Sequence, residues 1–216
     1  MSHSMRLVLG SFKPYSHFRP LHSAYRLKGS WWRLILLAIF SFLIVGITSF
    51  MNIKYAGEMP EYTGIAPDER ILFVLSEVIT DGLLGVLTLI VIVVGGALLY
   101  WPFFQQVGFK RLAYIHSYVV FILLIGMLLQ LPFIPFLHEP SLISPYSLGV
   151  YVDLLTNIPF WLYFSYSLSL FLAWGTFVQY AAIRQSTTVS RGYALFWIII
   201  LNVFMVAITA YMRTAF

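Results

Sequence analysis

Cysteine is absent from this chain and charge is scarce: charged residues make up 10% of its 216 positions, whereas hydrophobic residues make up 60%. The absence of cysteine excludes disulfides, thiol nucleophiles and cysteine-ligated metals, although it does not fix the redox compartment. A water-soluble domain of this length does not combine so few charges with a mean hydropathy of +0.86. The composition therefore predicts an integral membrane protein.

Familiar catalytic motifs are also missing. The sequence contains no HExxH, no Gly-x-Ser-x-Gly, no P-loop and no acid-rich metal motif, which are patterns that carry metal-dependent, nucleophilic and phosphate chemistry. We therefore expect a protein that is not an enzyme and that holds no cofactor and no metal. A membrane hydrolase that uses other residues is the alternative within the enzyme class.

Two long hydrophobic runs organise the chain. Residues 82–104 form 23 positions without a charge, and at about 1.5 Å per residue a helix of this length crosses a hydrocarbon core of about 30 Å. Residues 112–136 are long enough to cross back. Only seven residues separate the two runs, and Lys110 and Arg111 are among them. We therefore expect a tight membrane hairpin with a positively charged turn.

Three further runs complete the predicted fold, an all-α, polytopic transmembrane five-helix bundle. The expected spans are residues 31–53, 82–104, 112–136, 159–181 and 193–212. They make residues 31–216 a single transmembrane domain, preceded by a basic tail at residues 1–30. The tail mixes aromatic rings with cations, as segments that lie on anionic headgroups do. A mobile, solvated tail is the alternative, because Pro14 and Pro20 interrupt a continuous helix.

The charges predict the orientation of these spans. Ten of the 13 Lys and Arg residues fall on the N-terminal side of the five-span arrangement, and all eight acidic residues fall on the other side. The three exceptions are Lys54, Arg70 and Arg213. By the positive-inside rule, we expect a cytoplasmic N-terminus and a C-terminus outside. We interpret the membrane as a bacterial cell membrane.

The hairpin also resembles a known family. Gly108, Phe109, Lys110 and Arg111 follow the aromatic helix end YWPFF, and Tyr118 lies near the start of the next span. This pattern is similar to that of prokaryotic members of the Yip1 domain family, and the resemblance extends over most of the chain. The DLYGP element of the eukaryotic branch is absent. The resemblance implies a five-span, non-enzymatic membrane protein that binds other proteins.

Glu77 and Asp81 are the first candidate site. They are four residues apart, so on a helix they face the same way at a separation of about 6 Å. Two carboxylates at that distance can hold a proton or a cation between them. Counting back from Phe104 places Asp81 near the outer interface and Glu77 just beyond it. The alternative is a solvated helix start that carries acids because of the charge asymmetry.

His116 is the second candidate, because it is the only histidine inside an expected span. It is expected one turn below the inner interface, roughly a bilayer away from Glu77 and Asp81, so these three groups are not expected to form one metal site. A proton relay is one interpretation of His116. A hydrogen bond to a backbone carbonyl or to a neighbouring tyrosine is the other, and we favour it.

We expect this protein to act as an adaptor or scaffold. The alternative is a small transport component, either an accessory subunit of an exporter or a self-contained pore. A pore needs a continuous polar path, whereas the polar residues expected inside spans are few, neutral and typical of helix packing. They are Gln130, Ser165, Ser167, Ser169, Asn202 and Thr209. The absence of a midplane charge also disfavours an ion-coupled carrier.

The expected partners follow from this interpretation. They are the lipid bilayer and other membrane proteins, a transporter complex among them. Close helix packing is compatible with a homo-oligomer, and nothing in the sequence indicates nucleic-acid binding.

Overall fold

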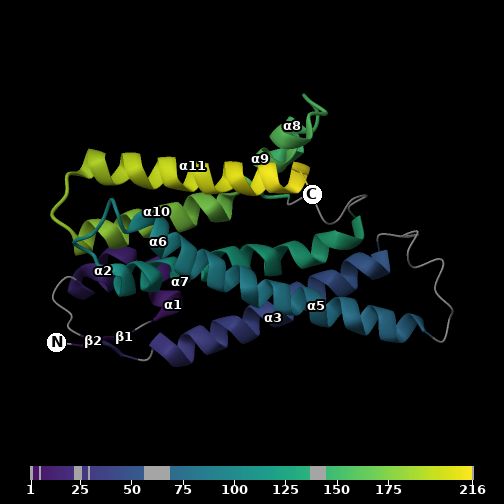
Figure 1. Ribbon diagram of the computed structural model, residues 1–216, viewed down its shortest axis with the longest axis horizontal. Coiled ribbons are helices and arrows are strands. Elements are labelled where there is room, and N and C mark those ends of the chain that lie inside the picture. The colour runs from purple at the N-terminus through teal and green to yellow at the C-terminus, as the bar shows by residue number, and fades with distance from the viewer. Residues whose placement is uncertain are drawn as a thin grey trace.

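The structure is a computed structural model that describes residues 2–4, 6–21, 26–28, 30–55, 69–136 and 145–215. Figure 1 shows long helices lying roughly side by side along one axis. Two three-residue strands, β1 (Ser2–Ser4) and β2 (Arg26–Lys28), pair in parallel next to the N-terminus. The remaining regular elements are helical, which confirms the predicted helical class.

The first two long helices, α3 (Ser30–Tyr55) and α5 (Arg70–Ile90), cross each other (Figure 1). Small residues allow this close crossing, because a Cβ atom at Gly85 would lie 2.7 Å from a methyl carbon of Val45. The Ser41 hydroxyl donates to the Gly85 carbonyl at 2.9 Å. This crossing confirms that the first predicted span is a helix, although α3 is slightly longer than residues 31–53.

The predicted hairpin is present in the structure, although Lys110 and Arg111 lie in the first turn of the returning helix instead of in the connecting turn. Helix α5 continues through a π-helical turn, η2 (Val91–Gly95), into α6 (Gly96–Tyr100), and α7 (Phe109–Gln130) packs back against α6. Gly108 immediately precedes α7 with φ of 79°, a conformation that favours glycine. Helix α7 ends in a 3-10 segment, η3 (Leu131–Phe136), where the prolines of the predicted third span lie.

The prediction of one continuous helix over residues 159–181 is wrong. The structure divides this run into α9 (Pro159–Ser167) and α10 (Leu170–Ser186), with Ser169 in an extended conformation between them. Figure 1 shows that α9 leaves the direction of α10 and leads back to the short helix α8 (Gly149–Val152). Helix α11 (Arg191–Ala215) then packs against both α9 and α10.

Backbone pairing explains the break between α9 and α10. Ser169 forms an isolated β-bridge with Ser147. The Leu170 N–H donates to the Tyr146 carbonyl at 3.0 Å, and the Leu168 carbonyl accepts from the Leu148 N–H at 3.0 Å. The Leu168 carbonyl and the Leu170 N–H therefore form hydrogen bonds with residues 20 and 24 positions earlier instead of bonds that would continue the helix.

As a result, four helices in the described part of the chain are long and apolar enough to cross a membrane. They are Trp31–Tyr55, Arg70–Tyr100, Phe109–Phe136 and Arg191–Ala215. Helix α10 has 17 residues and lies beside α7 and α11. The chain is therefore a helical, multi-pass membrane protein.

The N-terminal segment folds onto the bundle instead of extending as a free tail. It forms α1 (Leu7–Phe12), α2 (Pro14–Phe18) and a 3-10 turn, η1 (Arg19–Leu21). These elements contact α7 and α10, and the side chains of Phe18 and Leu21 are fully buried in the largest core cluster. The alternative of a mobile, solvated tail is therefore wrong for residues 7–21, and contact of this segment with anionic headgroups stays a prediction.

Charge separates the two ends of the bundle. We call the end that carries α1, α2 and the turn before α7 the basic end, and the end that carries the start of α5 and α8 the acidic end. Figure 1 places the two chain termini at these opposite ends. The described acids Glu69, Glu77, Asp81 and Asp153 belong to the acidic end.

Candidate functional site

Glu77 and Asp81 lie in the first half of α5, toward the acidic end. Both side chains are half-buried, and this half of α5 crosses α3, as the contact between Gly46 and Val78 shows. The helix spacing puts the two carboxyl groups on the same side, as predicted. Their use as a proton, cation or partner site stays a prediction.

His116 lies on α7, on the side that packs against α6. Its Nδ1 atom is 2.9 Å from the Leu112 carbonyl oxygen, which accepts the hydrogen bond, and its side chain is 3% exposed. The ring meets the ring of Tyr100 edge-on, with centroids 4.8 Å apart. A backbone carbonyl therefore satisfies one ring nitrogen, which is the second of the two sequence-based interpretations.

The other ring nitrogen of His116 faces Gly96. A Cβ atom at Gly96 would lie 2.8 Å from Nε2, and Nε2 is buried with no hydrogen-bond partner in the described part of the chain. Gly96 is fifteen positions after Asp81 on the continuous helix, about 22 Å along its axis. The structure therefore does not bring His116 together with Glu77 and Asp81.

The residues of the family-like hairpin motif have separate roles in the structure. Gly108 supplies the turn, and Phe109 begins α7 and packs edge-on against Trp101 at 6.5 Å between ring centroids. The Lys110 side chain is exposed, whereas that of Arg111 is half-buried. Tyr118 lies two turns further along α7 and is fully buried.

Tyr118 is the centre of a polar cluster at the basic end. Its hydroxyl is 2.8 Å from Nε2 of His17 on α2 and 2.8 Å from the Tyr114 hydroxyl one turn earlier on α7. It also accepts a hydrogen bond from the backbone N–H of Arg6 at 3.2 Å. One buried hydroxyl therefore connects the N-terminal segment to the third long helix.

Gly10 allows α1 to lie this close to Tyr118 and His17. A Cβ atom at Gly10 would lie 2.3 Å from Cε1 of Tyr118 and 2.7 Å from Cδ2 of His17. The Phe18 ring closes the cluster from the other side, edge-on to both tyrosines. The close contact between α1 and α7 thus depends on a residue without a side chain.

Arg33 of α3 adds a positive charge to this cluster. It is four residues before Leu37 and eight before Ser41, both of which are buried, so the three share the inward face of α3. The guanidinium is within electrostatic range of the Tyr114 and Tyr118 hydroxyls. We call His17, Arg33, Tyr114 and Tyr118 the Tyr118 cluster.

Nη1 of Arg33 is buried and has no hydrogen-bond partner among the residues that the structure describes. A guanidinium is always charged, and a buried charge without a partner is costly. The sequence has no acid before Glu58, and the described acids belong to the acidic end. Nothing described at the basic end therefore neutralises this charge.

A second polar contact joins α10 to α11. The Asn202 side-chain amide donates to Oε1 of Gln179 at 2.8 Å and to the Thr176 hydroxyl at 3.0 Å. Nearby, the Tyr100 hydroxyl donates to the Ile198 carbonyl at 3.2 Å. These contacts tie α6, α10 and α11 together within the bundle, as neutral polar residues commonly do between membrane helices.

Of the Tyr118 cluster, sequence reasoning singled out only Tyr118. It missed His17, Arg33 and Tyr114. His17 and Tyr118 are 101 positions apart, so no local pattern connects them. Arg33 stands beside Trp31 and Trp32, where it has the pattern of an ordinary interfacial cation. One signal was available: Arg33, Leu37 and Ser41 share one helix face, which turns the arginine inward.

The fold and these clusters define a helical, multi-pass membrane protein whose buried polar groups join neighbouring helices. No protein-family model, curated protein or solved structure matches the chain.

Proposed function

We propose that the protein is a non-enzymatic adaptor or scaffold that binds other membrane proteins. The observation that carries this proposal is the folded, cationic surface at the basic end. Lys13, Arg19, Lys110 and Arg191 expose their side chains there, on segments that tertiary contacts hold in place. A rigid surface binds a partner with less loss of conformational entropy than a free tail does.

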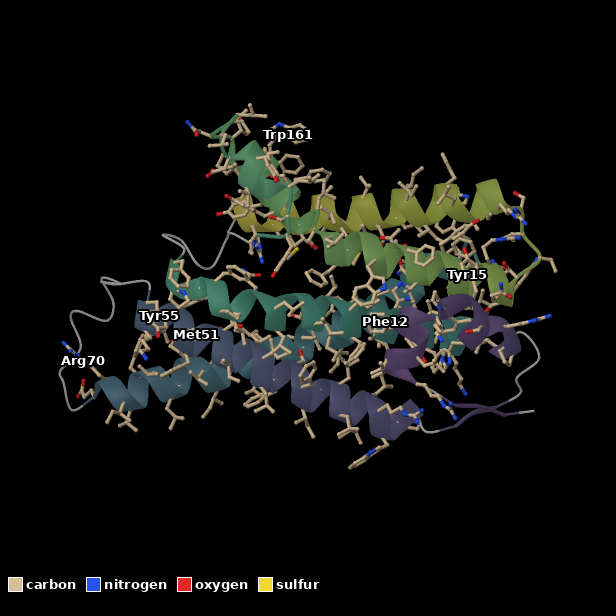
Figure 2. The ribbon with its side chains drawn as sticks, turned by 180° about the vertical axis from the view of Figure 1, so that it is seen from behind. Phe12, Tyr15, Met51, Tyr55, Arg70 and Trp161 are labelled. Atoms are coloured by element: carbon tan, nitrogen blue, oxygen red, sulfur yellow. The ribbon has the colours of Figure 1, made fainter. Side chains whose placement is uncertain are left out.

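Contacts between distant segments make this surface rigid. The Trp174 indole N–H donates to the Ser11 carbonyl at 3.0 Å. Figure 2 shows Phe12 and Tyr15 lying over the bundle at this end, where their rings contact Trp174 and Phe177 of α10. The exposed cations of the N-terminal segment are thereby held at the same end as Lys110, in the first turn of α7, and Arg191, the first residue of α11.

The transport alternative has less support. In the described helices, six hydroxyls donate to carbonyls of their own helix. They belong to Thr48, Ser117, Ser165, Ser167, Thr176 and Ser186. Asn202 and Gln179 are bonded to each other. Groups used in this way do not supply the continuous polar path that a pore needs.

The proposal includes the finer topology. Helix α10 acts as a fourth, short span, so that the chain crosses five times with its N-terminus in the cytoplasm and its C-terminus outside. The charge separation between the two ends supports this orientation. The resemblance to the Yip1 domain family supports the same span number. A reporter fused after Phe216 is expected to be active on the non-cytoplasmic side, and a cytoplasmic signal would overturn the topology.

Crosslinking in the native membrane, followed by affinity purification and mass spectrometry, tests the adaptor function. We expect a stoichiometric membrane protein, such as a transporter, an ATPase or a GTPase, to be recovered with the wild-type chain. The double variant Lys13→Glu with Lys110→Glu should reduce that recovery about tenfold, because it reverses two charges on the proposed surface.

The matched control reverses two charges at the acidic end, in Lys54→Glu with Arg213→Glu. It should recover the partner as the wild type does. If the wild type and both double variants are each recovered without a partner, the adaptor function is contradicted and a self-contained transport component is favoured. Equal losses in both double variants would show that net charge, and not the basic end, determines binding.

A further inference from the structure

The Tyr118 cluster contains a half-buried arginine, Arg33, whose charge no described acid at the basic end neutralises. Arginine side chains near helix ends usually extend to the membrane surface, where water solvates the guanidinium. Arg33 does not follow this pattern fully, because Nη1 is covered by protein. The arginine as a whole is nevertheless only half-buried, so part of the residue is accessible.

The chemistry around Arg33 favours an anion with several oxygen acceptors. A guanidinium presents its N–H groups in a planar fork that matches a phosphate group in two parallel hydrogen bonds. The hydroxyls of Tyr114 and Tyr118 lie within electrostatic range of the same guanidinium. Their positions are held by the bonds to His17 and by the N–H of Arg6.

The depth of the site points to a lipid as the source of that phosphate. Trp31 and Trp32, directly before Arg33, are 80% and 65% exposed. Tryptophans exposed at the end of a membrane helix lie at headgroup level. A guanidinium adjacent to them is at the depth where phospholipid phosphates are concentrated, at an end of the protein whose other charges are also positive.

We propose that Arg33, on the inward face of α3 beside the exposed Trp31 and Trp32, binds the phosphate group of an anionic phospholipid. The lipid supplies the negative charge that the basic end lacks, and its headgroup lies against α3 and α7 next to the docked N-terminal segment. This binding is independent of the adaptor function. A partner protein is not needed for it, so the two proposals fail separately.

Native mass spectrometry of the purified full chain in detergent tests this site. The wild type is titrated with phosphatidylglycerol, and the same titration is made with Arg33→Gln. We expect Arg33→Gln to bind phosphatidylglycerol about tenfold more weakly, because it loses charge-assisted hydrogen bonds. The matched control is Lys110→Gln, which removes one exposed charge from the same end and should bind within about twofold of the wild type.

Two further titrations identify the source of the phosphate. We expect phosphatidylcholine, whose choline offsets the phosphate charge, to bind the wild type more weakly than phosphatidylglycerol, and Arg33→Gln to weaken it by a smaller factor than it weakens phosphatidylglycerol. Inorganic phosphate at the same concentration should not displace phosphatidylglycerol. Displacement would overturn the assignment to a lipid and indicate a soluble phosphate ligand instead.

The proposal is overturned if Arg33→Gln binds phosphatidylglycerol as tightly as the wild type, or if Lys110→Gln loses as much as Arg33→Gln. If Arg33→Gln does not accumulate in the membrane, Arg33→Lys replaces it. That variant keeps the charge but loses the planar fork, and it should bind severalfold more weakly than the wild type. Binding equal to that of the wild type would then contradict the proposed recognition by a guanidinium.

Discussion

His17 and Tyr118 are joined side chain to side chain across 101 positions of sequence, with 2.8 Å between Nε2 and the hydroxyl oxygen. The same hydroxyl accepts from the Arg6 N–H and bonds to Tyr114. This arrangement makes residues 6–21 part of the bundle. A substitution that removes the Tyr118 hydroxyl therefore removes three hydrogen bonds at once, those to Arg6, His17 and Tyr114.

Replacing Tyr118 by phenylalanine should destabilise the fold by about 1–3 kcal/mol, because the ring is kept while buried donors lose their partner. The N-terminal segment should become the first region that a protease cuts. Thermal unfolding in detergent and limited proteolysis measure the two effects. Tyr15→Phe is the control, since Tyr15 is exposed on the same segment and packs by its ring against Phe177; equal losses in both variants would contradict the role of the cluster.

Two adjacent glycines should respond in opposite ways to alanine. A Cβ atom at Gly96 would lie 2.4 Å from Cδ2 of His116, whereas at Gly95 the nearest such contact is 3.9 Å, to Val91. Gly96→Ala is therefore expected to cost about 1–3 kcal/mol through overpacking. Gly95→Ala should be neutral or slightly stabilising, because alanine favours the helix. The free energies of unfolding in detergent test this order, and a larger cost at Gly95 would show that the packing is different.

The amide contact between α10 and α11 should appear as a measurable coupling. Asn202→Ala, Gln179→Ala and the double variant form a thermodynamic cycle for the 2.8 Å hydrogen bond. We expect a coupling free energy of about 0.6–2 kcal/mol, the range found for hydrogen bonds between membrane helices. A coupling near zero would mean that this bond does not hold the two helices together.

The break before α10 should depend on Ser169. Its side chain accepts from the Leu172 N–H at 3.2 Å and so caps the helix. Ser169→Ala is expected to cost about 1 kcal/mol in the free energy of unfolding. The hydroxyl of Ser167 donates to the Tyr163 carbonyl of its own helix, so Ser167→Ala should change stability little. A loss at Ser167 equal to that at Ser169 would contradict the cap.

Hydropathy and charge were sufficient to predict most of the fold. Long uncharged runs predict helices, because a backbone in lipid must satisfy its own hydrogen bonds. The structure confirms helices in the first three spans and the last, although the second helix ends at Tyr100 and not at Phe104, and the third changes to a 3-10 segment at Leu131. The prediction of one continuous helix for the fourth span was wrong, because pairing of Ser147 with Ser169 breaks the helix. Hydropathy at the break does not reveal a partner so far away in the sequence.

The sequence by itself thus determined that this is a helical, multi-pass membrane protein with a tight hairpin, and it predicted the end of the bundle at which the structure places the described acids. These properties follow from composition and from the spacing of charges along the chain. Only the tertiary structure decided that residues 7–21 are part of the core and that Arg33 faces inward beside Tyr114 and Tyr118. The physical reason is that burial and pairing of polar groups depend on contacts between segments far apart in sequence, which no local period encodes.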